Sequence, residues 1–305
     1  MHPKPQNLWH VLRETISNWS QHGATTHSAA LAYLSLFSLA PVLILVVAVA
    51  GWVFGADAAQ GKVARELSRF VGPEGAAVVQ QIVAASARPK SGQIAAVIGS
   101  ITLLVTATGA LMQLQETLNT VWEVVPKPGF FLKRLLKKRL LCLVLILGVG
   151  GLLLTSLAAS AGLAFLQRVL EAQLDVGLAR LVGGADVLFS WLLMTAIIAM
   201  VYRILPDVQI AWRDVAWGSG LTAVLFLVGK YAIGFYLQRA GVASTYGAAG
   251  SVVLILVWVY YSSLIFLFGA EFTRIHSRKY RQGRVAPEPG AVRTATIKVP
   301  LEASR

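Results

Sequence analysis

The chain has 305 residues, of which 56% are hydrophobic and only 13% are charged, and its formal net charge is +13. Soluble domains carry about 25% charged residues, so this composition, with several apolar runs of about 20 residues, excludes an ordinary soluble domain and predicts a polytopic membrane protein. The same unbroken runs exclude a β-barrel, whose strands are short and alternate in polarity.

The first helical segment expected from the sequence is amphipathic. Trp9, Leu12, Ile16 and Trp19 recur at three- and four-residue steps, so they share one stripe of a helix. We interpret residues 1–28 as a cytoplasmic amphipathic segment whose helix lies on the membrane with its tryptophans at headgroup level. A soluble helix packed on a cytoplasmic loop is the alternative.

Six apolar runs follow, and they predict an all-α membrane domain over residues 29–275. At about 1.5 Å per residue, each run is long enough to cross a hydrocarbon core of roughly 30 Å. More polar, amphipathic stretches between the runs predict short interfacial helices. The predicted spans cover residues 32–54, 94–112, 140–165, 187–205, 215–237 and 247–270.

Prolines and glycines in these runs predict kinks, helix ends and close packing. Pro41 lies inside the first span, where it removes a backbone donor and predicts a kink. Pro206 follows the fourth span and, with Asp207, is interpreted as a helix stop and cap. Small residues that permit close helix approach are expected at Gly51, Gly55, Gly247 and Gly250.

The distribution of basic residues predicts the orientation. Residues 126–139 carry six Lys and Arg with no acid, and eight more follow from Arg274 to the end of the chain. Connections on the cytoplasmic side of a membrane are enriched in such residues. We therefore expect both termini in the cytoplasm, a basic and disordered tail over residues 276–305, and contacts of this loop and tail with anionic headgroups rather than nucleic acid.

Lys230 is the strongest candidate for a functional residue, because ionisable residues inside a span are functional by default. It lies about seven residues from the outer end of the fifth span, roughly 10 Å of helix. Three interpretations stay open. Its ammonium reaches outward to water, it binds an amphiphile headgroup or an acidic partner, or it forms a buried structural ion pair.

Polar residues near the ends of two other spans are further candidates for substrate binding or gating. Gln113 and Glu116 share a helical face, with Asn119 nearby, and this face either lines a cavity or emerges into the headgroups. Glu271 either pairs with Arg274, three residues along the helix, or faces the interior of the bundle.

Four stretches of the chain resemble the YihY/BrkB family of bacterial inner-membrane proteins, long labelled ribonuclease BN-like. They cover residues 30–43, 114–122, 202–226 and 244–272, in the family's order. The resemblance implies six transmembrane helices and a bacterial inner membrane. It also implies links to serum or complement resistance and to the movement of lipid precursors or phospholipids in the envelope.

The ribonuclease label finds no support in the residues. A metal-dependent nuclease needs clustered His and Asp ligands, whereas the histidines lie near the two ends of the chain, and no nucleotide-binding GxxxxGK[ST] loop is present. We therefore expect no metal, no cofactor and no enzyme activity, and an intramembrane enzyme ranks third because no nucleophile–base pair is visible. The five histidines are His2, His10, His22, His27 and His276.

Two functional hypotheses follow. The first is a transporter or flippase of an amphiphilic, lipid or lipid-linked substrate in envelope biogenesis. It is motivated by polar residues within the spans and by amphipathic segments beside them. The alternative is a scaffold or partner-binding subunit of an envelope lipid-transfer system that transports nothing itself. Membrane lipids are expected partners in both cases, and a homo-oligomer or an envelope protein partner is compatible with either.

Overall fold

The computed structural model describes residues 8–38, 109–127, 176–240, 250–280, 286–288 and 291–294, and also 140–155 apart from 142–143, 146 and 153–154. These residues are mostly helical, as expected. Further helical turns cover 24–38 and 109–121 and part of 140–155. The long helices are α1 (Leu8–Gln21), α6 (Val176–Ile204), α7 (Trp212–Ala240) and α9 (Gly250–Tyr280).

Two of these helices contain segments long and apolar enough to cross a membrane, at Trp212–Ile233 and Val252–Arg278. A shorter apolar segment, Leu188–Ile204, lies in α6. These segments overlap the last three predicted spans, because hydropathy alone identifies them. Most of the first three predicted spans lies outside the described residues, as do Pro41, Gly51, Gly55 and Gly247, so the count of six stays a prediction. Gly250 begins α9, and Pro206 is buried in the bend that follows α6.

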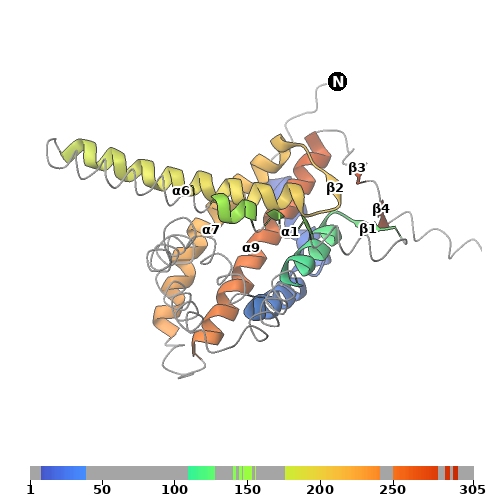
Figure 1. Cartoon of the computed structure of the whole chain (residues 1–305), viewed down its shortest axis with the longest axis horizontal. Helices are drawn as coiled ribbons and strands as arrows, with labels where there is room; N and C mark the ends of the chain where they lie inside the picture. Colours follow the sequence, from blue (N-terminus) through green and yellow to red (C-terminus); the bar gives the residue numbers. More distant parts are fainter. Residues whose placement is uncertain are drawn as a thin grey trace, which may run out of the picture.

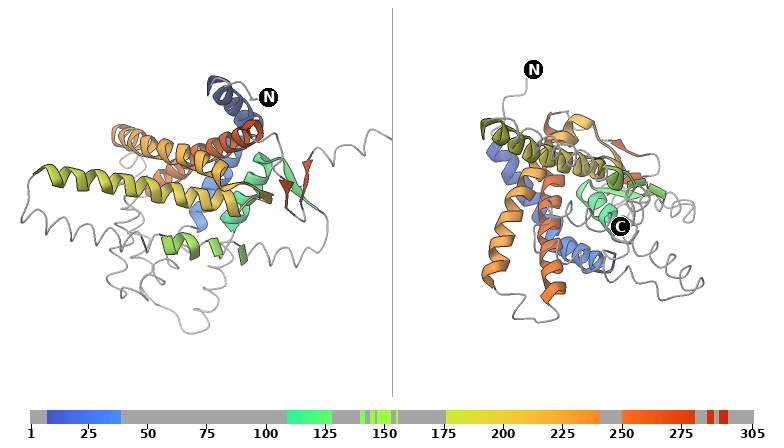
Figure 2. Two further views of the ribbon diagram at one scale, coloured as in Figure 1. Left: turned by 90° about the horizontal axis from the view of Figure 1, so that it is seen from above. Right: turned by 60° about the vertical axis from the view of Figure 1, so that its left-hand side comes forward.

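Helices α6, α7 and α9 form the centre of the described fold. Helices α7 and α9 run side by side in opposite directions, and α6 crosses them near the end where the strands gather (Figures 1 and 2). One buried tyrosine joins all three. The hydroxyl of Tyr202 on α6 donates to the carbonyl of Phe266 on α9 at 2.6 Å and lies 3.1 Å from the hydroxyl of Thr222 on α7.

The close approach of α7 and α9 depends on two glycines. A Cβ atom added at Gly218 would lie 1.6 Å from Oγ1 of Thr273, and one at Gly269 would lie 1.7 Å from Oγ1 of Thr222. Each threonine hydroxyl donates to a glycine carbonyl of its own helix at 2.7 Å, so both side chains are fixed. The antiparallel pair therefore has two reciprocal glycine–threonine contacts, a form of the small-residue packing seen in membranes.

Two small antiparallel sheets lie at one end of these helices, which we call the strand end (β1 to β4, Figure 1). Strand β1 (Val124–Pro126) pairs with β4 (Ala291–Arg293), and β2 (Val208–Gln209) pairs with β3 (Ala286–Pro287). Strands β1 and β2 follow helices directly and leave backbone groups to be paired. The expected disordered tail is therefore corrected for these residues, because the tail supplies the partners of both strands.

Helix α1 packs against α9 rather than standing alone. Val11 is buried in a cluster with Phe272 and Ile275, and the indole nitrogen of Trp19 donates to the carbonyl of Leu264 at 3.2 Å. Only part of the predicted apolar stripe takes part, because Trp9 stays 72% exposed. The helix is thus held by α9 while an apolar side chain remains outside.

Candidate functional site

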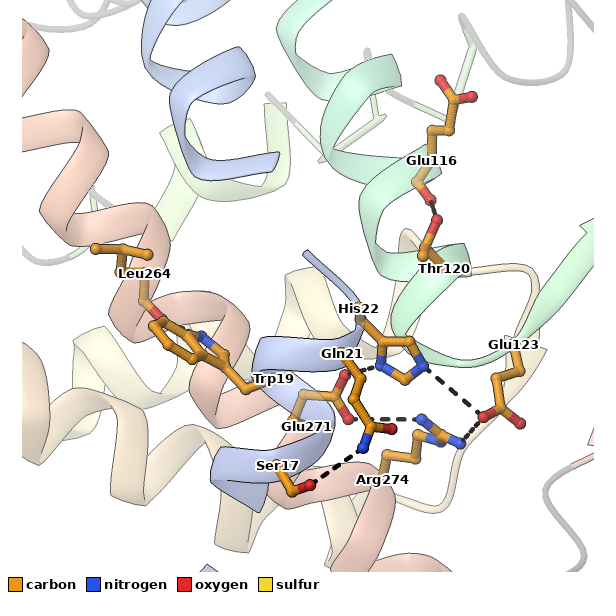
Figure 3. A network of polar contacts seen from close by, with 10 residues as sticks. All are labelled: Ser17, Trp19, Gln21, His22, Glu116, Thr120, Glu123, Leu264, Glu271 and Arg274. Atoms are coloured by element: carbon orange, nitrogen blue, oxygen red, sulfur yellow. Dashed lines mark hydrogen bonds and ion pairs between the residues drawn. The ribbon is translucent and has the colours of Figure 1, made fainter. Parts of the chain in front are cut away.

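Four ionisable side chains from three separate segments converge at the strand end (Figure 3). His22 contacts Glu271 through Nδ1, and Arg274 contacts Glu123. Two longer contacts close the ring. Arg274 Nη1 lies 3.5 Å from Glu271 Oε2, and His22 Nε2 lies 3.8 Å from Glu123 Oε1. We call these four residues the ionic cluster.

Local backbone geometry places each member of the ionic cluster. Gly23 adopts a left-handed φ of 64°, which ends α1 and holds His22 at its tip. Glu123 also adopts a left-handed φ, 53°, where helix 109–121 turns into β1, and its carbonyl accepts the amide of Thr294 at 2.9 Å. Glu271 and Arg274 stand three residues apart on one face of α9.

At the centre of the ionic cluster, the side chains of Glu271 and Arg274 are buried, but the atoms by which they face each other lack hydrogen bonds. The side chain of Glu271 is 1% exposed and that of Arg274 is 8% exposed, whereas Glu123 is 55% exposed. Within the described residues, Glu271 Oε2 and Arg274 Nη1 make no hydrogen bond and meet only through their 3.5 Å ionic contact. A buried group without a hydrogen bond costs about 1–3 kcal/mol. The cluster is therefore held by charge pairing, without the full set of hydrogen bonds that a purely structural site acquires.

A second group of polar contacts is centred on Asp207, and we call these hydrogen bonds the Asp207 tie. Its carboxylate accepts hydrogen bonds from Asn119 at 2.9 Å and Gln115 at 3.2 Å, and its amide donates to Asn119 Oδ1 at 2.8 Å. The carbonyl of Asp207 accepts the amide of Glu288 at 3.0 Å. Asp207 thus joins helix 109–121, the bend after α6 and the tail, a wider role than the predicted helix cap.

The residues predicted to bind or gate a substrate differ in their surroundings. Glu271 belongs to the ionic cluster, where it is buried and lies 3.5 Å from Arg274, and its role in binding or gating stays a prediction. Asn119 bonds to Asp207 through both its oxygen and its nitrogen, and its role in binding or gating stays a prediction. Glu116 is exposed and points away from the ionic cluster (Figure 3). Gln113 is half-buried, and its carbonyl accepts the hydroxyl of Thr117 at 2.9 Å.

Lys230 lies well away from both polar groups. It stands 18 residues after the first residue of α7, about 27 Å along the helix axis, whereas Asp207 lies just before that helix begins. The side chain is half-buried, and its ammonium lies 5.0 Å from the ring centroid of Tyr231, within reach of a cation–π interaction. Lys230 and Glu271 therefore occupy different depths of the helix bundle.

Sequence reasoning missed His22 and Glu123 because their partners are distant in the chain. His22 and Glu271 are 249 positions apart, and no local spacing links them. The available signal was a local sequence pattern, since a histidine beside a glycine between two helical stretches marks a helix end. In the part of the chain that the structure describes, no group of three or more His, Cys, Asp or Glu side chains is arranged to hold a metal.

Two described helices have segments long and apolar enough to cross a membrane, and relatives named as membrane proteins place the chain in the class of mainly helical integral membrane proteins. The chain belongs to the family described as Virulence factor BrkB, which matches residues 15–293, and this confirms the family resemblance drawn from the sequence. No solved structure matches the chain.

Its relatives include proteins named UPF0761 membrane protein from several bacteria. The one from Tolumonas auensis is 30% identical over 246 residues, which cover 80% of this chain and 77% of the relative. The one from Alcanivorax borkumensis is 26% identical over 268 residues, covering 85% and 58%. The one from Nitrosospira multiformis is 28% identical over 295 residues, covering 93% and 64%. The chain thus spans about three-fifths of the length of the last two.

Proposed function

We propose that this protein moves an amphiphilic substrate, a lipid or lipid-linked precursor, across the bacterial inner membrane, and that the ionic cluster gates this movement. The observation that supports the proposal most is the loose pairing of Glu271 with Arg274 in a buried position. Burying charges at the end of an apolar helix is costly. Partners without full hydrogen bonding can be exchanged for a polar ligand at less cost than a fully bonded pair.

The gate would work by competition for the guanidinium of Arg274 and the imidazole of His22. In the closed arrangement, His22 and Arg274 hold the carboxylates of Glu271 and Glu123 and so tie α1, α9 and the turn before β1 together. An anionic headgroup offers phosphate oxygens that bind a guanidinium in the same manner as a carboxylate. Its arrival would release Glu271 and loosen the tie between the three segments.

Lys230 would supply a second polar contact for the substrate at another depth of the helix bundle. Its half-buried ammonium lies in the apolar segment Trp212–Ile233, and ionisable residues within membrane-spanning segments mark substrate pathways. We place the strand end in the cytoplasm, so Lys230 lies toward the outer leaflet. The positive charge of the loops and the tail supports this orientation.

The test of the proposal is lipid scrambling in vesicles. Purified protein is reconstituted in phosphatidylcholine vesicles with a trace of fluorescent phosphatidylglycerol, phosphatidylethanolamine or phosphatidylcholine, and movement is read by chemical bleaching of the outer leaflet. We expect the protein to accelerate the anionic phosphatidylglycerol above protein-free vesicles, and Lys230→Met to slow it about tenfold, equivalent to ~1.4 kcal/mol. Rates equal to those of empty vesicles for every headgroup would count against transport.

A non-transporting scaffold is the second candidate, and the Asp207 tie favours it. Together with strands β1 to β4 it joins two loops and the tail at one end, as a platform for a partner protein would require. In this case the vesicle assay gives no acceleration, while the protein co-purifies with an envelope lipid-transfer protein and Lys230→Met leaves that complex intact. A homo-oligomer would be seen in the same purification by its mass.

A further inference from the structure

Two arginines and two tryptophans flank the connection between α6 and α7, near the facing ends of these two helices. The apolar segment of α6 ends at Ile204, and that of α7 begins at Trp212. The guanidinium carbon of Arg203 lies 5.3 Å from the centroid of the Trp212 ring. Trp212 is 59% exposed and Trp217 is 69% exposed, and Arg213 is exposed as well.

The acids of the same connection are turned to other partners. Asp207 accepts hydrogen bonds from Asn119 and Gln115, and Asp214 is buried, with 5% exposure. Among the described residues, no carboxylate forms an ion pair with Arg203 or Arg213, whereas Arg274 contacts both Glu123 and Glu271. The outward surface of this connection is therefore positively charged and aromatic.

These features match the chemistry of an anionic phospholipid headgroup. Tryptophan rings settle at the level of the headgroups, where an apolar body and a polar N–H are both accommodated. A guanidinium beside such a ring presents a planar set of donors that fits phosphate oxygens in pairs. The ends of two apolar segments place the arginines at the same level, because each segment stops where the hydrocarbon core stops.

We propose that Arg203, Trp212 and Arg213 form a binding site for the headgroup of an anionic phospholipid of the surrounding bilayer. The two guanidiniums bind the phosphate, and the indole packs against the glycerol and the first acyl carbons. The site is separate from the ionic cluster and does not depend on transport, so a protein that moves no lipid would still bind one here.

The test measures quenching of Trp212 fluorescence by brominated lipids in nanodiscs that contain the full chain. Two probes with identical brominated acyl chains are compared in phosphatidylcholine, one phosphatidylglycerol and one phosphatidylcholine. Because the chain has eight tryptophans, the Trp212 signal is taken as the difference between each protein and its counterpart carrying Trp212→Phe. We expect the anionic probe to quench Trp212 at a several-fold lower mole fraction than the zwitterionic probe.

Charge variants assign the preference to the site. Arg203→Gln and Arg213→Gln should each reduce the preference for the anionic probe about fivefold, the effect of removing one basic residue at an anionic surface. Arg293→Gln, which removes an exposed arginine on β4, should leave it unchanged. If Arg203→Gln fails to fold, the exposed Arg213 carries the test.

Three results would overturn the proposal. The first is equal quenching of Trp212 by both probes. The second is a preference that survives in every folded arginine variant. The third is relief of quenching by soluble glycerol phosphate, which would show that the site takes a free phosphate compound rather than a membrane lipid.

Discussion

At the residue scale, Glu271 is a buried carboxylate that contacts His22 on the segment after α1 and Arg274 on its own helix. It was a candidate from the sequence because an acid at the end of an apolar run is rare, and its pairing with Arg274 follows from their spacing. Its contact with His22 could not be predicted, because it depends on how α1 folds onto α9. Asn119 likewise bonds to a residue distant in the chain, Asp207, and its role in binding or gating stays a prediction.

The pairing of Glu271 with Arg274 predicts that substitutions at these two positions have non-additive effects on the free energy of unfolding. Arg274→Gln removes the cation beside the buried Glu271 and leaves His22 as its partner in the ionic cluster, so it should lower the free energy of unfolding by about 3 kcal/mol, in the range for a broken buried pair. Glu271→Gln should cost less, because an amide is cheaper to bury than an isolated charge. The double variant should then cost clearly less than the sum of the two. Denaturation in detergent measures all three, with exposed Glu116→Gln as the control, and strictly additive costs would contradict the coupling.

The hydrogen bonds of the Asp207 tie predict a loss of stability that is independent of the ionic cluster. Asp207→Ala removes the acceptor for Gln115 and Asn119, and leaving buried donors unpaired costs about 1–3 kcal/mol for each. We expect a lower unfolding midpoint for Asp207→Ala than for Gln209→Ala, an exposed position two residues along. Equal midpoints for the two variants would show that the tie contributes nothing to stability.

At the element scale, the α7–α9 pair was predicted as two spans but not as a tightly packed pair. Hydropathy identifies an apolar helix, yet it does not say which of its faces meets a neighbour. Gly218 and Gly269 stand among many glycines in the sequence, and only the contacts with Thr273 and Thr222 single them out.

Two Gly→Ala substitutions in this helix pair should affect stability differently, because only one of them meets a close neighbour. Gly269→Ala places a Cβ 1.7 Å from Oγ1 of Thr222, so the helices must separate, and overpacking of this kind typically costs 1–3 kcal/mol. Gly220→Ala on α7 meets its nearest atom at 3.7 Å and should be neutral or stabilising by up to about 1 kcal/mol, since alanine favours helix. Thermal denaturation in detergent compares them, and equal melting temperatures would contradict the packing.

At the scale of the whole molecule, the tail and the loops at the strand end form one assembly. The strand pairings of 124–126 with 291–293 and of 208–209 with 286–287 were not predictable, because strands of two or three residues carry no periodic pattern. The basic composition of the tail suggested disorder, and the backbone groups exposed by β1 and β2 override that tendency in the paired residues.

Removing the tail should loosen the strand end while leaving the helices folded. A chain that stops after Tyr280 lacks β3 and β4, so the amides of Val124, Val125 and Gln209 lose their strand neighbours. We expect hydrogen exchange at these amides to become at least about tenfold faster, a change of ~1.4 kcal/mol in local opening, while α9 keeps its protection near Leu267. Unchanged exchange in both strands would show that the tail does not hold them.

If the ionic cluster gates the movement of an amphiphile, a change in its charge should change the rate of lipid scrambling. Vesicles with fluorescent phosphatidylglycerol receive the parent protein, Glu271→Gln or the matched control Glu116→Gln, each shown to be folded by its elution as a single species. Neutralising Glu271 removes the charge that holds His22 and Arg274, so the gate should open more readily. We predict scrambling about tenfold faster than the parent for Glu271→Gln and unchanged for Glu116→Gln. Identical rates for all three proteins would contradict the gate.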